Sequence, residues 1–346
     1  MKHAVVVGAQ GVIGRTLVDH LAGLDDWRVV GLSRRPGASA ERVRHVRVDL
    51  LDPIATRTAL AGLTDATHLF YAAYQDRPTW SELVAPNLAM LTNVVQAVEE
   101  VAPDLAHVSL MQGYKVYGAH LGPFRTPARE SDPGHMPPEF NVAQQDFLER
   151  RPGRRWSWSA IRPSVVCGFA VDNPMNLVTV LAVYASISRE LGLPLRFPGA
   201  PGAYRTLMEV TDAGLLARAT VWAATDPACA DQAFNIANGD LFRWDDLWPR
   251  IADWFGLEVA PPLRMSLAEV MADKEPVWDT MVRRHGLAHA YAEVSAWPFG
   301  DAVFGWDYDF FADTSKSRRF GFHEYVETAQ MFPRLFTELR SRRVIP

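Results

Sequence analysis

The sequence predicts an α/β fold in which a parallel sheet carries helices on both faces. Up to about residue 165, short apolar runs alternate with stretches whose apolar residues recur at helical spacing. A glycine-rich turn, GAQGVIG, directly follows the first apolar run. Beyond about residue 167 the alternation ends, and the pattern becomes mainly helical and rich in Trp and Phe. We therefore expect a Rossmann-type doubly wound domain over residues 1–166 and a mainly helical region over 167–346, parts of which complete the sheet.

The alternation places each expected element. Apolar runs predict strands at 4–9, 28–33, 43–50, 66–73, 105–112 and 158–166. The helical patterns between them are GRTLVDHLAGL, PIATRTALAGL, WSELVAPNLAMLTNVVQAVEEVA and FNVAQQDFLERR. Ligands of such sheets bind beyond the carboxyl ends of the strands, so the aromatic C-terminal region is expected to form a core and to wall an apolar cleft there.

Composition excludes several classes of protein. With 48% hydrophobic and 22% charged residues and a formal net charge of −5, no broad attraction to nucleic acid or to an anionic membrane is expected. Cys167 and Cys229 predict neither a disulfide framework nor a metal site. The first strand begins at Ala4 and leaves no room for a signal peptide, and the apolar stretch at 177–187 is far shorter than the ~18 residues of a membrane span. A cytoplasmic protein is expected.

Three glycines predict a nucleotide site. Gly8, Gly11 and Gly14 lie between the first strand and the first helix, in the order G-x-x-G-x-x-G. Glycines there permit a tight turn and close approach of the backbone to a pyrophosphate, which the helix N-terminus attracts. The turn residues expected to bind a cofactor are Gly8, Gln10, Gly11, Val12, Ile13 and Gly14.

The end of the second strand indicates which dinucleotide binds. About twenty residues past the last glycine, an NAD enzyme places an acid for the adenosine ribose. This sequence has Ser33, Arg34 and Arg35 there, and guanidinium groups suit a 2′-phosphate. NADP(H) is therefore favoured, although paired arginines also simply solvate strand ends. Asp49 and Leu50, closing the next strand, are placed to meet the adenine, and an Asp there is also a common turn former.

The stretch QGYKVYG holds a lysine flanked by tyrosines just after the fifth expected strand. Many nicotinamide-dependent reductases pair these residue types as Tyr-x-x-x-Lys along a helix. Lys115, with Tyr114 and Tyr117 beside it, does not have that spacing. The local pattern therefore leaves open which tyrosine, if any, works with Lys115.

Longer stretches resemble one family. They are GAQGVIG, LSRRP, NLAMLTNVV, QGYKVYG, IRPSVVCGF, NPMNLV, AFNIANGDLFRWDDLW, KEPVWDTMV and FADTSKSRRFGF. In them the chain resembles the progesterone 5β-reductase and iridoid synthase (PRISE) family of atypical short-chain dehydrogenases, which use NADPH to reduce the carbon-carbon double bond of enones. The resemblance runs from the first strand to near the C-terminus.

The resemblance implies roles for individual residues. Lys115 matches the family's catalytic lysine. The family's tyrosine lies in a later F-Y-Y segment, matched here by FNVAQQD, which places Val142 where the catalytic phenol belongs. Tyr117 matches a tyrosine that the family already has, so it is only a weak catalytic candidate. Further implied contacts are Ala72, Lys115, Pro163, Val165 and Val166 for the cofactor, and Tyr74, Gln112, Asn141, Met175 and Tyr204 for the substrate.

The missing phenol has a chemical consequence. Hydride added to the β-carbon of an enone leaves negative charge on the carbonyl oxygen, which a tyrosine hydroxyl beside an ammonium stabilises. Valine offers no donor, and losing one typically costs ~3 kcal/mol, which slows a reactive enone without abolishing its reduction. Lys115 is expected to bind the nicotinamide ribose and supply positive charge; the alternative is a plain surface lysine. A water molecule or another side chain is then expected to donate to the substrate oxygen. Tyr74 is favoured as a residue that contacts the substrate over one that transfers a proton.

Together these features predict an NADPH-dependent reductase of α,β-unsaturated carbonyl compounds with a small apolar substrate. Two alternatives stay open. One is another NADP-dependent reaction, either carbonyl reduction or a redox-assisted rearrangement. The other is a non-catalytic NADP(H)-binding sensor. The sequence leaves a homodimer open.

Overall fold

A computed structural model describes residues 1–35, 37–134, 136 and 139–346, and the chain divides into two units. Unit 1 comprises Met1–Ser164, Ala213–Ile236 and Asp313–His323. Unit 2 comprises Val165–Asp212, Ala237–Ala312 and Glu324–Pro346. The chain thus leaves unit 1 after Ser164 and then returns to it twice.

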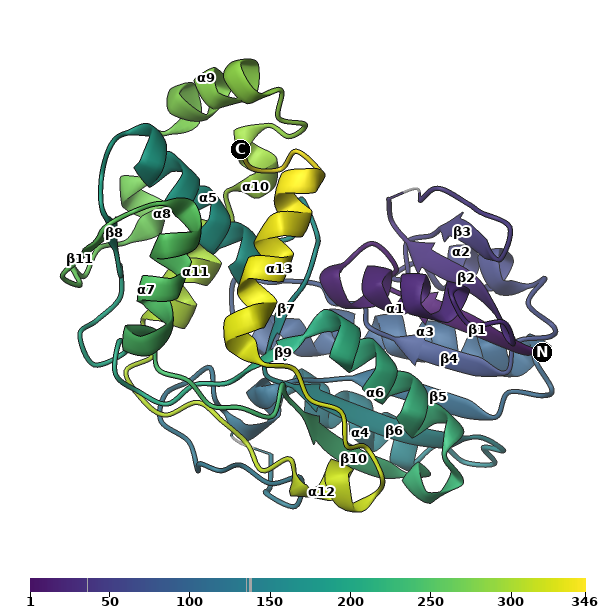
Figure 1. Cartoon of the computed structure of the whole chain (residues 1–346). Helices are drawn as coiled ribbons and strands as arrows, with labels where there is room; N and C mark the ends of the chain where they lie inside the picture. Colours follow the sequence, from purple (N-terminus) through teal and green to yellow (C-terminus); the bar gives the residue numbers. More distant parts are fainter. Residues whose placement is uncertain (36, 135, 137–138) are drawn as a thin grey trace. The chain divides into compact units, whose positions relative to one another are not determined.

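Unit 1 contains a seven-stranded parallel sheet in the order β10-β6-β5-β4-β1-β2-β3 (Figure 1). The strands are β1 (Lys2–Val7), β2 (Trp27–Ser33), β3 (Val43–Arg47), β4 (His68–Tyr71), β5 (His107–Met111), β6 (Ser157–Pro163) and β10 (Gln232–Ile236). This order confirms the predicted Rossmann-type sheet. Its edge strand β10 comes from the region beyond residue 167.

One predicted strand is wrong in extent. The apolar run at 158–166 forms two strands, because β6 ends at Pro163 and β7 (Val165–Cys167) belongs to another sheet. A proline has no N–H to donate to a strand ladder, which favours the break. In unit 2, β7 pairs with β9 (Val210–Asp212) as a parallel two-stranded sheet.

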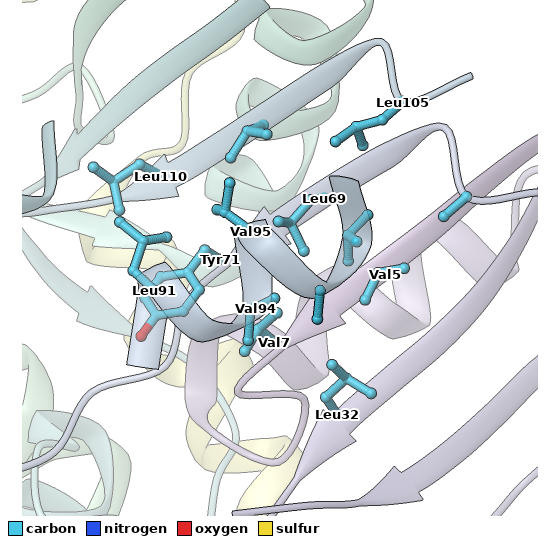
Figure 2. Close-up of a cluster of buried hydrophobic side chains, with 14 of the residues drawn as sticks. Val5, Val7, Leu32, Leu69, Tyr71, Leu91, Val94, Val95, Leu105 and Leu110 are labelled. Carbon is cyan, nitrogen blue, oxygen red and sulfur yellow. The ribbon is translucent and has the colours of Figure 1, made fainter. Parts of the chain in front are cut away.

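Helices cover both faces of the unit 1 sheet because side chains alternate along each strand. Val5 and Val7 of β1 pack with α2 (Pro53–Leu60), α3 (Val84–Val101) and α4 (Phe140–Glu149). Figure 2 shows Leu91, Val94 and Val95 of α3 against these strands. Ala4 and Val6 face the other side, where α1 (Val12–Ala22) and α6 (Ala213–Thr225) pack. Unit 1 also holds η1 (Ser81–Leu83), η2 (Tyr114–Tyr117), η3 (Pro227–Cys229) and α12 (Ser315–Arg319).

Unit 2 is built around α5 (Leu177–Glu190), whose residues 177–188 are all buried. The helices that contact α5 are α7 (Trp244–Phe255), α9 (Glu275–His285), α10 (Tyr291–Val294), α11 (Trp297–Phe304) and α13 (Thr328–Ser341). The unit also contains α8 (Leu267–Val270) and a strand pair formed by β8 (Leu195–Arg196) and β11 (Val259–Ala260). The Phe197 ring lies 5.2 Å from Trp248 and 5.3 Å from Phe304, so these aromatic residues form core. Among the described residues, no helix has the length and apolarity that crossing a membrane requires.

Two buried histidines in the sheet predict acid-sensitive stability. His107 places its ring nitrogens 2.8 Å from Ser157 Oγ and 2.9 Å from Ser159 Oγ, and burial lowers its pKa to about 3. Burial also lowers the pKa of the neighbouring His68 to about 4. Below pH 6.5 the unfolded chain binds protons that the folded chain does not, so each histidine lowers the free energy of unfolding by about 1.4 kcal/mol per pH unit.

We therefore expect His107 alone to cost about 2 kcal/mol of stability between pH 6.5 and pH 5. Urea unfolding across this range measures the loss. His107→Asn, which cannot titrate, is expected to be less stable at pH 7 but to lose less stability on acidification. An unchanged pH slope in this variant would contradict the assignment.

Candidate active site

The glycine turn between β1 and α1 leaves no room for side chains at two positions. Gly8 has a φ of 83°, and a Cβ atom there would lie 2.7 Å from the Ala72 carbonyl oxygen. A Cβ atom on Gly14 would collide with the Gly8 carbonyl oxygen. Gly11 is the N-cap of α1 and has no side chain that could cover the N–H groups of the first turn. This cradle fits a dinucleotide pyrophosphate.

The other predicted turn residues surround this cradle. Val12 is buried, and Ile13 and Gln10 are half-buried. The Gln10 amide nitrogen lies 3.5 Å from Nδ1 of His45, a β3 residue that was not among the predicted site residues. The Ala72 N–H donates to the Val7 carbonyl, which ties the end of β4 to the start of the turn.

The ends of β2 and β3 carry the residues predicted to face the adenosine. Arg34 and Arg35 are exposed immediately after β2, and the Ser33 hydroxyl donates to the Arg35 carbonyl. Asp49 is exposed and accepts the N–H two residues along at 3.0 Å, which is a turn-forming contact. Leu50 is buried. Two cations therefore lie at the end of β2.

Lys115 lies in η2, which follows β5. Its Nζ is 3.4 Å from the Tyr74 hydroxyl and 4.9 Å from the centroid of that ring. The Trp80 ring centroid is 5.0 Å away, so the ammonium contacts two aromatic rings. The Tyr74 hydroxyl donates to Asp76 Oδ1 at 2.9 Å. The structure thus brings a tyrosine to Lys115 from the loop after β4.

Burial controls the protonation of this group of side chains. It lowers the pKa of Lys115, and the carboxylates of Asp76 and Glu139 act in the opposite direction. Burial raises the pKa of Tyr74, and its hydrogen bond to Asp76 adds to the effect. Burial also raises the pKa of Glu139. The phenol therefore keeps its proton at neutral pH, with a cation on one side and a carboxylate on the other.

Val142 lies in the first turn of α4 and presents no polar side-chain atom. Its N–H donates to Glu139, the residue that caps the helix, at 3.1 Å. Asn141 donates to the same carboxylate at 2.8 Å, and Gln112 donates to the Asn141 carbonyl at 2.9 Å. A Cβ atom on Gly134 would lie 2.6 Å from Val142 Cγ2, so the valine packs on that loop. Gln112 and Asn141 thereby hold the start of α4 beside η2.

Arg162 is a buried cation that was not among the predicted site residues. It is 4% exposed and lies on β6. Its guanidinium donates to Gln112 Oε1 at 2.8 Å, the Tyr117 hydroxyl at 3.0 Å, Gln145 Oε1 at 3.0 Å and the Glu130 carbonyl at 3.3 Å. The signal was a charged residue inside the apolar run SAIRPSVV. This arginine holds Gln112, which in turn holds α4.

Tyr117 belongs to the same network. Its hydroxyl donates to Asn235 Oδ1 at 2.7 Å while accepting from Arg162, and its ring lies 5.3 Å from the guanidinium carbon. The Asn235 amide donates to the carbonyls of Ala128 and Asp313 at 3.2 Å each. The Tyr117 proton is therefore engaged inside the protein, and the residue connects β10 to η2.

The remaining residues predicted to contact the cofactor or the substrate belong partly to unit 1 and partly to unit 2. Pro163 ends β6 in unit 1, whereas Val165 and Val166 form β7 in unit 2. Met175 and Tyr204 also belong to unit 2. The Met175 N–H donates to an asparagine side chain at 3.0 Å, and burial raises the pKa of Tyr204.

A polar hollow of about 720 Å³ lies elsewhere in unit 1, along β10 and α12. Its walls include Arg129, Asp313, Lys316 and Glu149. Arg129 and Asp313 pair with each other at 3.5 Å, so these charges stabilise one another. Within the described ranges, no three His, Cys, Asp or Glu side chains are placed to hold a metal ion.

Comparison with known families identifies the chain. The model of the PRISE-like Rossmann-fold domain matches residues 49–346. The chain belongs to this family. The match spans η2, α4 and all of unit 2, and the family resemblance read from the sequence is confirmed.

Curated relatives of this PRISE-family chain are enzymes. The (S)-8-oxocitronellyl enol synthase CYC2 of Camptotheca acuminata is 34% identical over 99% of this chain and 93% of its own length. The 3-oxo-Δ(4,5)-steroid 5β-reductase of Arabidopsis thaliana is 34% identical over the same shares. The short chain dehydrogenase gsfE of Penicillium aethiopicum is 32% identical over 100% of this chain and 99% of its own. The chain is an oxidoreductase of the short-chain dehydrogenase type.

Solved structures share the fold of this family member at low sequence identity. The UDP-glucose 4-epimerase of Thermus thermophilus, in complex with NAD, has a TM-score of 0.67 and 17% identity over 98% of this chain and 99% of its own. The Bordetella bronchiseptica enzyme WbmH, in complex with NAD⁺, has a TM-score of 0.66 and 16% identity over the same shares. These structures support the fold alone.

Proposed function

We propose that this PRISE-family member is an NADPH-dependent reductase of small apolar α,β-unsaturated carbonyl compounds. The observation that carries the proposal is the half-buried Lys115 ammonium, which follows the carboxyl end of β5 between two aromatic rings. Ligands of doubly wound sheets bind at such strand ends. Relatives named as a steroid 5β-reductase and an enol synthase support an unsaturated carbonyl as the substrate.

The residues of unit 1 fit a phosphorylated dinucleotide, which supplies a hydride when it is bound. Because Gly8 and Gly14 have no side chains, the backbone of this turn can approach a pyrophosphate closely. Arg34 and Arg35 suit a 2′-phosphate, because each guanidinium offers two parallel donors and a fixed charge. The Lys115 ammonium is suited to a ribose hydroxyl. Ala72 and Pro163 are expected to contact the nicotinamide half.

The proposed reaction depends on the positive charge of Lys115. Reduction at the β-carbon of an enone moves negative charge to the carbonyl oxygen. The Lys115 ammonium supplies a positive field to this oxygen, and partial burial strengthens that field because water screens it less. The Val142 side chain can donate no hydrogen bond, so the proposed mechanism uses no phenol at that position.

The two arginines give a prediction for cofactor choice. Replacing Arg34 and Arg35 together by alanine is expected to raise the Kd for NADPH by at least about tenfold, because charge-assisted bonds worth about 1.5–3 kcal/mol each are lost. The Kd for NADH is expected to stay unchanged, since NADH has no 2′-phosphate. Fluorescence titration measures both constants. Arg28→Ala, at the other end of β2, is the matched control; equal losses for NADPH and NADH would contradict the assignment.

A panel of small enones and enals tests the proposed reaction. With purified protein, NADPH absorbance and product analysis are expected to show one saturated carbonyl formed per NADPH oxidised. An alcohol with the double bond intact would show carbonyl reduction instead. Product formation without net NADPH oxidation would show a redox-assisted rearrangement, and tight NADPH binding without turnover would show a sensor. Each of these three outcomes overturns the proposal.

A further inference from the structure

The family resemblance places Val142 where other members have their catalytic tyrosine. Lys115 nevertheless has the phenol of another tyrosine beside it. The Tyr74 hydroxyl lies 3.4 Å from Lys115 Nζ. This tyrosine comes from the loop after β4, 41 residues before the lysine, and not from α4. A Tyr-Lys pair is therefore assembled here from different segments of the chain.

The surroundings fix the Tyr74 ring at the start of α4. Its centroid lies 5.6 Å from that of Phe140, the first residue of the helix. Asn87 holds the same loop from α3, since its side chain accepts from the Gln75 N–H at 2.8 Å and donates to the Gln75 carbonyl at 2.9 Å. The phenol thus stands between η2 and the helix turn that contains Val142, on a loop anchored by a buried asparagine.

The other tyrosines of this region are less suited to serve a substrate. Tyr117 is 6% exposed, and its hydroxyl donates to Asn235 while accepting from Arg162. Tyr114 is 3% exposed. Tyr74 is partly exposed, and its hydroxyl proton points to the exposed carboxylate of Asp76. Rotation of the hydroxyl redirects that proton without movement of the heavier atoms.

We infer that Tyr74 replaces the missing phenol and donates the proton to the substrate oxygen, an inference that rests on the proposed enone reduction. A dihydronicotinamide is the reductant, and its hydride forms the new C–H bond at the β-carbon. The π electrons of the double bond then form the enolate, whose oxygen takes the Tyr74 proton as the phenol O–H bond breaks. The phenolate is left beside the Lys115 ammonium and regains a proton from it, and water reprotonates the lysine. Water also protonates the α-carbon as the enol loses its O–H proton, which gives the saturated carbonyl.

Tyr74→Phe tests the inference, because it removes one oxygen and keeps the ring that packs on Phe140. We expect kcat to fall by about 10²-fold or more, the usual contribution of a general acid. The Kd for NADPH, from fluorescence titration, is expected to stay unchanged. The solvent deuterium isotope effect on kcat is expected to be present in the wild type and lost in this variant. Tyr325→Phe is the matched control, since it removes the same oxygen from a tyrosine that is 77% exposed, and its kcat is expected to stay within about threefold.

A double variant tests whether the pair acts as a unit. If Tyr74 works through the Lys115 charge, Tyr74→Phe combined with Lys115→Met is expected to lose little more activity than Lys115→Met alone. Two observations would overturn the inference while leaving enone reduction in place: wild-type kcat in Tyr74→Phe, or single losses that multiply in the double variant. Absence of enone turnover in the wild type would instead overturn the proposed function, and the inference with it.

Discussion

Lys115→Met is expected to lower kcat/KM for enone reduction by about 10²–10³-fold. Methionine keeps the unbranched stem among the Tyr74 and Trp80 rings but removes the ammonium. A unit charge about 4 Å from the developing oxyanion contributes about 4 kcal/mol at an effective dielectric constant of 20, and this contribution disappears. Stopped-flow or steady-state NADPH oxidation measures the loss.

The free energy of unfolding of Lys115→Met distinguishes a catalytic lysine from one that stabilises the fold. Burial lowers the pKa of Lys115, which means that the fold disfavours its charged form. Lys115→Met is therefore expected to leave the free energy of unfolding unchanged or slightly raised. Lys2→Met, which removes an exposed lysine paired with Asp26, is the control and is expected to keep full activity. Near-wild-type turnover in Lys115→Met, or an activity loss matched by unfolding, would contradict the proposed role.

The parts of the fold that the sequence predicted are those set by local constraints. The turn from β1 to α1 could be predicted because only glycine fits at Gly8 and Gly14, where nearby backbone atoms exclude a Cβ atom. The central strands could be predicted because they are apolar on both faces. In β1, for example, Val5 and Val7 pack on one face and Ala4 and Val6 on the other. The break after Pro163 was missed because an apolar run does not show where a strand changes sheets.

The site was predicted only in part, because its contacts join distant segments. Lys115 was found through its motif, but its contact with Tyr74 spans 41 residues and leaves no periodic signal. Tyr117 was a candidate for catalysis, yet its hydroxyl is satisfied by Asn235, 118 residues away. Such pairings depend on strand order, since β10 and β5 both neighbour β6 only in the folded sheet.

Arg162→Met is expected to destabilise the protein by about 1–3 kcal/mol, because removal of the guanidinium leaves buried oxygen acceptors without a donor. All four acceptors of the guanidinium are uncharged oxygens. One of them, Oε1 of the buried Gln112, would lose its donor in a region that is largely closed to water. Typical domains have only 5–15 kcal/mol of stability in total, so urea unfolding resolves this change easily.

The matched control is Arg150→Met, because Arg150 makes a surface ion pair with Asp146 at 3.2 Å and its side chain is 80% exposed. Such pairs contribute about 0–1 kcal/mol, so this variant is expected to unfold close to the wild type. Arg162→Lys keeps the charge but lacks the planar fork that reaches four oxygens, and its stability is expected to fall between those of wild type and Arg162→Met. If Arg162→Met unfolds like Arg150→Met, the buried guanidinium does not hold Gln112 and Tyr117 in place, and the geometry of η2 rests on the packing of Tyr114 and Val116 alone.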